Sequence, residues 1–121
     1  MIEVLVTALV LSVGVLGLAA LQGFSIQSGQ AAYQQTQALN LAYEVADHVR
    51  ANRSVFQSGG TLPAIARWQE LVTQMLPNGN LAVNVVGAAA DGVVSITVTW
   101  ADDRIGDTPE AGESIVINTR I

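Results

Sequence analysis

Few residues of this chain could do chemistry, and the most suggestive is its single histidine, His48. Asp47 precedes His48 and Ser54 follows it closely, so a nucleophile, a base and an orienting acid are all present as residue types. Consecutive residues of a helix point in different directions, however, whereas a triad needs its members to converge on one point. We therefore expect no enzymatic activity, and we predict that His48 makes a surface contact or joins its helix to the rest of the domain.

A second group of chemically suggestive residues is an acidic segment near the C-terminus. It contains Asp102, Asp103, Asp107, Glu110 and Glu113. Carboxylates can bind calcium, but the ligand spacing of a calcium-binding loop is missing here. We expect a solvated acidic loop or a contact surface for a neighbouring subunit, with no metal ion and no cofactor.

Composition excludes several classes of function. The net charge is −5, lysine is absent and the five arginines are scattered, which argues against nucleic acid or an anionic lipid surface as a partner. The chain has no cysteine, so it has no thiolate metal site, cysteine nucleophile or disulfide. With 121 residues it has room for one small domain and an appendage.

The third chemically suggestive residue is Glu3, which stands at the head of a long apolar run, "MIEVLVTALVLSVGVLGLAALQ". No charged residue occurs from Val4 to Leu21, and this length is typical of a membrane-spanning helix. Each leucine or valine favours insertion by about 0.3 to 0.6 kcal/mol, whereas a carboxylate at the helix centre costs about 2.5 to 3.5 kcal/mol. The segment should therefore insert with Glu3 attached.

Three interpretations of this segment remain open. A secretory signal peptide would begin with cationic residues, whereas this segment begins with an acid. A plain signal anchor would explain the hydrophobicity but would leave Glu3 without a role. In the third interpretation the carboxylate awaits a cationic partner inside the membrane, because an unpaired charge there is costly.

The sequence predicts one long helix from the start of the chain to about Arg53, since no proline precedes Pro63. Residues 22–37 are uncharged and rich in glutamine, alanine and serine. An apolar stripe with steps of three and four residues follows, formed by Ala38, Leu41, Ala42, Val45, Ala46 and Val49. On the other side, the spacings of Glu44 with His48 and of Asp47 with Arg50 suit helix-surface pairs.

The remainder of the chain predicts a small sheet. A loop should lead to a short helix that has Pro63 in its first turn and ends at residues 77–79. Alternating apolar residues then indicate three antiparallel strands, marked by Leu81 to Val85, Val94 to Trp100 and Ile115 to Ile121. We expect Trp68 and Trp100 to lie in the core.

The predicted fold class is therefore α+β, with the shape of a lollipop. The C-terminal half of the long helix packs its apolar stripe on one face of the three-stranded sheet, because so small a sheet cannot bury a core alone. We divide the chain into residues 1–30, which span the membrane or lie in a filament core, and residues 31–121, which form the globular head.

Three stretches carry a resemblance to a known family: "IEVLV" at 2–6, "GVLGLAALQ" at 14–22 and "LAYEVADHVRANR" at 41–53. The chain up to residue 53 resembles type IV pilins and type II secretion pseudopilins, in particular minor pilins of the PilV class. In that family a leader ends in glycine, and a phenylalanine, a short polar residue, a leucine or methionine, isoleucine, glutamate and an aliphatic run follow. Met1 falls on an interior position of this motif, so we expect a leader and the first mature residues to precede it.

The resemblance implies a structural subunit of type IV pili that helps to initiate assembly. Its head would lie in the periplasm, and its helix in the inner membrane before it enters the fibre. The partners it implies are other minor pilins, the major pilin, a tip adhesin, membrane lipid and a prepilin peptidase acting on the missing N-terminal region. Glu3 would pair with the N-terminal amine of an adjacent subunit. We further expect Gly14 and Gly17 either to loosen the helix during assembly or to allow close helix packing.

Other functions remain as alternatives. A type II secretion pseudopilin has the same architecture and serves a secretion piston. A signal-anchored periplasmic binding module would stay monomeric, with Glu3 incidental. A membrane-anchored hydrolase lacks the residues that its chemistry requires.

Overall fold

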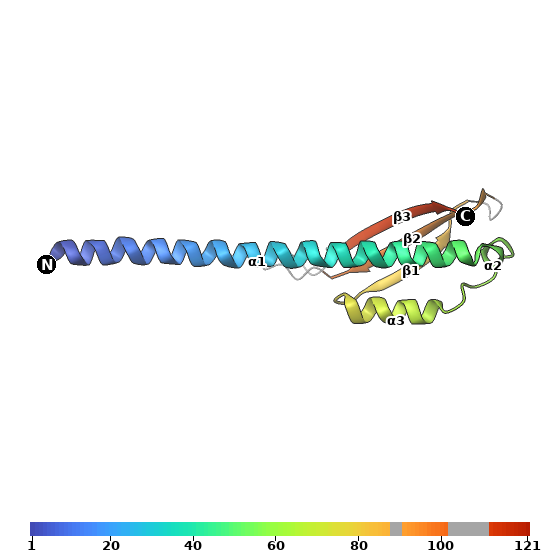
Figure 1. The fold of residues 1–121 in the computed structure, drawn as a ribbon, viewed down its shortest axis with the longest axis horizontal. Coiled ribbons are helices and arrows are strands. Elements are labelled where there is room, and N and C mark those ends of the chain that lie inside the picture. The colour runs from blue at the N-terminus through green and yellow to red at the C-terminus, as the bar shows by residue number, and fades with distance from the viewer. Residues whose placement is uncertain (88–90, 102–111) are drawn as a thin grey trace. The chain divides into compact units, whose positions relative to one another are not determined.

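The computed structural model describes residues 1–87, 91–101 and 112–121. Its elements are α1 (Ile2–Ala51), α2 (Arg53–Gln57), α3 (Ile65–Met75), β1 (Asn80–Val85), β2 (Val93–Trp100) and β3 (Glu113–Arg120) (Figure 1). The predicted α+β class is confirmed, with a long N-terminal helix, a three-stranded antiparallel sheet and short additional helices. Contacts within the chain form two compact units, Met1–Ala32 and Tyr33–Ile121.

The first unit consists of the N-terminal turns of α1. Helical hydrogen bonding continues through Gly14 and Gly17, although each glycine costs about 1 kcal/mol relative to alanine. The apolar side chains of this part are exposed, from Ile2 to Ile26. By length and composition the segment could cross a membrane. So much exposed aliphatic surface needs lipid or other protein around it.

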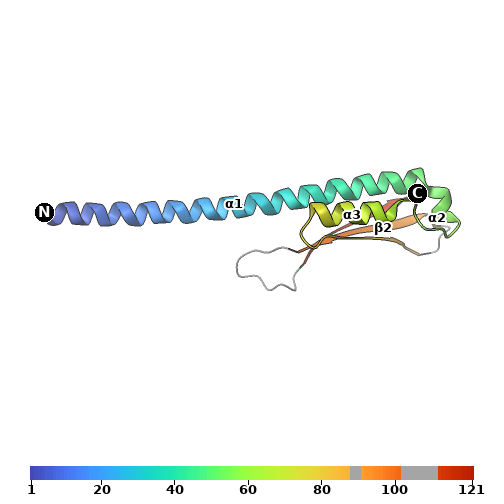
Figure 2. The same ribbon diagram turned by 90° about the horizontal axis from the view of Figure 1, so that it is seen from below.

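The second unit has its core between the last turns of α1, α3 and one face of the sheet. All six residues of the predicted stripe, from Ala38 to Val49, are buried, as expected from their spacing. Val72 and Leu76, at the end of α3, join the same core. Figure 2 shows these turns of α1 and α3 on the same side of the sheet.

The sheet has the predicted meander order β1-β2-β3, with both pairs antiparallel. Along β2 every second residue is buried against the helices, namely Val94, Ile96, Val98 and Trp100. The register places Leu81 opposite Val98 and Ile96 opposite Ile117, so the inward side chains of the three strands form one apolar layer.

The structure departs from the prediction between α1 and β1. The predicted loop contains the five-residue helix α2, which buries Phe56. Helix α3 starts at Ile65 and not at Pro63, because Ala64 has a φ of 60° and the Ile65 N–H bonds the Leu62 carbonyl at 3.4 Å. A left-handed residue cannot continue a helix, so Pro63 lies in the preceding turn.

The two tryptophans differ in how deeply they are buried. Trp100 is buried, as predicted. Trp68 is half-buried and packs against the margin of the core, so its placement in the core was only partly right. In the acidic segment, Asp102, Asp103, Asp107 and Glu110 lie outside the described residues, and Glu113 begins β3 opposite Trp100.

Candidate functional site

Glu3 lies in the first turn of α1 and is exposed. Val4, Thr7, Ala8 and Leu11 line a shallow depression beside it. The Thr7 hydroxyl donates to the Glu3 backbone carbonyl at 2.7 Å, as threonine often does within a helix. None of these neighbours has a cationic side chain, so no side chain that lines the depression neutralises the Glu3 carboxylate.

Gly14 and Gly17 differ in their surroundings. Gly14 lines an apolar depression on one side of the helix, together with Val6, Thr7, Val10, Leu11, Val15 and Leu18. Gly17 is not among the residues that line it. A Cβ atom added at either glycine would meet nothing within 4 Å. Packing against the described residues therefore does not require glycine at either position.

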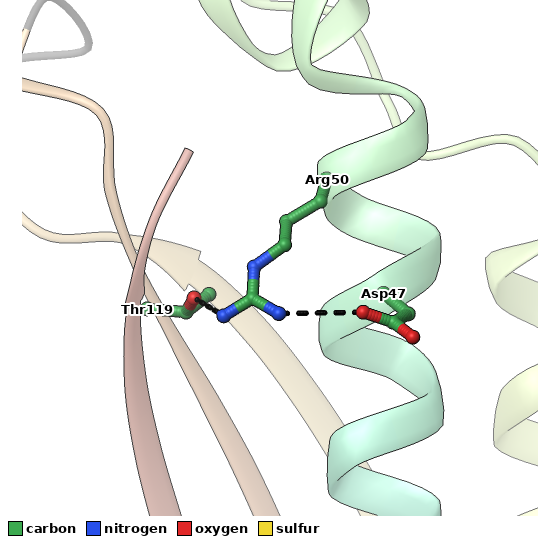
Figure 3. Close-up of polar contacts among 3 residues, drawn as sticks. All are labelled: Asp47, Arg50 and Thr119. Atoms are coloured by element: carbon green, nitrogen blue, oxygen red, sulfur yellow. Dashed lines mark hydrogen bonds and ion pairs between the residues drawn. The ribbon is translucent and has the colours of Figure 1, made fainter.

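A polar contact joins the end of α1 to the sheet (Figure 3). The Arg50 Nη1 lies 3.3 Å from the Asp47 Oδ1, which is the helix-surface pair that the spacing predicts. The Arg50 Nη2 donates to the Thr119 Oγ1 at 2.8 Å. Both side chains of the ion pair are largely exposed, at 55% and 82%, so the pair by itself contributes little stability.

His48 joins α1 to the turn before α3. Its Nε2 lies 2.8 Å from the Pro63 carbonyl oxygen, and its ring centroid is 5.8 Å from that of Trp68. This is the contact role predicted for His48. Among the described residues, the other predicted pair, Glu44 with His48, is not formed, so this second prediction was wrong.

Asp47 and His48, two of the residues that could suggest a catalytic triad, make separate contacts. Asp47 faces Arg50, whereas the His48 ring faces Pro63, so the two side chains serve different contacts. Within residues 1–87, 91–101 and 112–121, no three acidic or histidine side chains lie close enough to hold a metal ion. Most of the acidic segment lies outside these ranges.

A groove beside β1 is a further feature that the sequence did not indicate. It has a volume of about 480 Å³ and lies between residues 59–62 and the strand residues Leu81 to Val85. Its only sequence signal is the pair Gly59 and Gly60, which predicts a loop but not what the loop faces.

No family model matches the chain, and comparison with the curated proteins and with the solved structures gives no significant match.

Proposed function

We propose that this chain is a structural subunit of a type IV pilus, a minor pilin that acts in assembly and catalyses no reaction. One observation carries the proposal. Glu3 is an exposed carboxylate at the head of an uncharged, exposed apolar helix, and the side chains around it provide no cation. The α+β fold and the resemblance of residues 1–53 to pilins support the same conclusion.

The physical argument concerns the cost of an isolated charge. A carboxylate removed from water inside a helix bundle is destabilising unless a cation and further hydrogen bonds compensate for it. The N-terminal amine of an adjacent subunit would supply that cation. Because attraction between opposite charges strengthens as water is excluded, the pair would also set the axial register between neighbouring subunits.

In this proposal the exposed aliphatic surface of α1 has two successive environments. Inner-membrane lipid surrounds it before assembly, and the helices of other minor pilins and of the major pilin surround it afterwards. The head, residues 31–121, lies in the periplasm and forms contacts between subunits or with a tip adhesin. A prepilin peptidase acts before assembly, on the region preceding Glu3.

Two alternatives predict different phenotypes. A type II secretion pseudopilin would share the charge pair, but its deletion would abolish export of secreted proteins and leave twitching motility intact. A signal-anchored binding module would need no contact between membrane segments, and Glu3 would have no partner.

Photo-crosslinking within the membrane segment tests the proposal. A benzophenone amino acid at Leu11, which lines both depressions of the first unit, should crosslink in living cells to another subunit. Mass spectrometry should locate the crosslink in the apolar N-terminal helix of that subunit. The same probe at Tyr43, an exposed residue of α1 in the second unit, is the matched control. If the Leu11 probe gives only lipid adducts, the chain is a solitary anchor and the proposal is wrong.

A further inference from the structure

The register of β1 shows which of its backbone groups are left without a strand partner. The Val86 N–H donates to the Val93 carbonyl at 2.9 Å, and β1 pairs antiparallel with β2 so that Val85 faces Val94. Because bonded and non-bonded pairs alternate in an antiparallel ladder, the even-numbered residues of β1 bond to β2. The N–H and C=O groups of Leu81, Val83 and Val85 therefore point away from β2, toward the edge of the sheet.

These outward groups border the 480 Å³ groove. Its opposite wall consists of Phe56, Gly59, Gly60, Thr61 and Leu62, together with Ile65 and Gln69 of α3. No lining side chain carries a charge. In the part of the chain that the structure describes, no backbone hydrogen bond joins residues 59–62 to β1, so this wall does not serve as a fourth strand.

Gln69 closes one end of the groove. Its Nε2 donates to the Leu81 carbonyl at 3.5 Å, a bond that requires this carbonyl to face outward, as the register predicts. The Leu81 carbonyl thus has a partner, and Val83 and Val85 remain as the outward-facing residues of β1.

The size of the groove suits one short strand. A residue in a sheet occupies about 160 Å³, from a rise of about 3.3 Å, a strand spacing of about 4.8 Å and a layer spacing of about 10 Å. Pairing with Val83 and Val85 needs about three extended residues, whose summed volume is of the same order as that of the groove.

We propose that this groove binds an extended, uncharged segment of a partner protein as an added antiparallel strand on β1. The backbone of the segment exchanges hydrogen bonds with the N–H and C=O groups of Val83 and Val85, as in other cases of β-strand addition. Residues paired in this way point to the same face of the sheet, so two side chains of the segment face Leu62 and Ile65 and are apolar. The residue between them lies beside Asn84 on the opposite face and is polar.

A folded second copy fits the groove less well than a free segment does. The other edge of the sheet, β3, could in principle pair with β1 of a neighbour. Within its own unit, however, β3 already carries α1 against it through the contact of Arg50 with Thr119. That helical layer would meet the wall formed by residues 59–62. The inference concerns only the head and does not depend on Glu3 or on filament assembly.

Hydrogen exchange on the full chain in detergent micelles tests this site. The probe is a capped peptide of alternating threonine and valine, with two valines. In the free protein, the Val83 and Val85 amides should exchange faster than those of Ala82 and Asn84, which bond to β2. At a peptide concentration about ten times the Kd, exchange at Val83 and Val85 should slow about tenfold. A peptide N-methylated at both valines cannot donate these bonds and should give no protection.

A proline substitution provides the matched variant. Val83→Pro removes only an outward N–H, and proline is tolerated at such positions of edge strands. Asn118→Pro likewise removes only an outward N–H, on the other edge strand, β3. The Ile121 N–H bonds the Gly92 carbonyl, so the odd-numbered residues of β3 bond to β2 and the backbone groups of Asn118 face outward. We expect Val83→Pro to abolish protection at Val85 and Asn118→Pro to retain it. If Val83→Pro unfolds the head, the two peptides on the natural chain decide the question.

Three outcomes would overturn the inference. They are equal protection by the plain and N-methylated peptides, no protection at any peptide concentration, and protection of Val83 and Val85 that rises with the concentration of the protein alone. The last outcome would mean that a second copy occupies the groove.

Discussion

Arg50 and Thr119 are 69 residues apart in the sequence, yet the guanidinium of Arg50 donates to the Thr119 hydroxyl at 2.8 Å (Figure 3). The contact joins the last turns of α1 to the final strand of the sheet. Thr119 is only 6% exposed, so its hydroxyl needs a partner, and Arg50 provides one. The last turns of α1 and the sheet are thus held together by a directional contact as well as by their apolar core.

Replacing Thr119 with valine tests this contact. Thr119→Val keeps the shape of the side chain but removes the acceptor, and we expect a loss of about 1 kcal/mol in the free energy of unfolding. Arg50 is partly exposed and can turn to water, which limits the loss. Urea unfolding of the full chain, followed by tryptophan fluorescence, measures the effect. Asp47→Asn is the control and should cost less than about 0.5 kcal/mol, because its pair is at the surface. Equal effects of the two variants would contradict this account.

The small residues of the stripe on α1 should tolerate no enlargement. Ala42 is fully buried between the helix and the sheet, so Ala42→Leu should destabilise the head by about 1 to 3 kcal/mol through overpacking. The same substitution at Ala51, which is exposed at the end of α1, should be nearly neutral. The measurement is the urea midpoint at unchanged m-value. A neutral Ala42→Leu would mean that the core lies elsewhere.

Gly92 combines a left-handed backbone with a crowded site. Its φ is 63°, and a Cβ there would lie 2.7 Å from the Ile121 carbonyl oxygen. Gly59 has a φ of 74° and nothing within 4 Å, so it isolates the backbone contribution. We expect Gly59→Ala to cost about 1 kcal/mol and Gly92→Ala at least about 1 kcal/mol more. Thermal or urea unfolding measures both losses. If the two variants lost the same free energy of unfolding, the close approach of the Ile121 carbonyl would not contribute to the cost at Gly92.

The two glycines of the apolar N-terminal segment, Gly14 and Gly17, should respond differently to a large side chain. Gly14→Leu fills the depression on its face of the helix, whereas Gly17→Leu leaves that depression open. If a neighbouring helix packs there, Gly14→Leu should lower the amount of subunit in sheared filaments more than Gly17→Leu does. Alanine at both positions should leave assembly unchanged. Loss of assembly in the double alanine variant would instead favour a need for helix flexibility.

The sequence predicted the parts of the fold that depend on local periodicity. The stripe from Ala38 to Val49 was correct at every residue, because a helix buries whatever recurs at its own period. The alternation in β2 was correct for the same reason, with a period of two. Both patterns are visible without knowledge of any partner element.

Features set by tertiary contacts were not predicted. The start of α3 depends on a turn at Ala64, and the preceding Pro63 carbonyl is engaged by His48 from another helix. The groove beside β1 depends on which amides face outward and on a loop that lies beside them without bonding to them. Neither follows from the residues of one segment. The role of Glu3 stays a prediction, since its proposed partner belongs to another chain.

The most direct test of the proposed function is the ratio of filament-bound to membrane-bound subunit for Glu3→Gln. The comparison is with the unchanged chain and with Glu44→Gln, an exposed carboxylate in the head part of the same helix. Glutamine preserves size and membrane insertion but removes the charge. We predict a fall of at least about tenfold for Glu3→Gln, equivalent to about 1.4 kcal/mol, and no change for Glu44→Gln. An unchanged ratio for Glu3→Gln would contradict the pairing of this carboxylate with a neighbouring subunit.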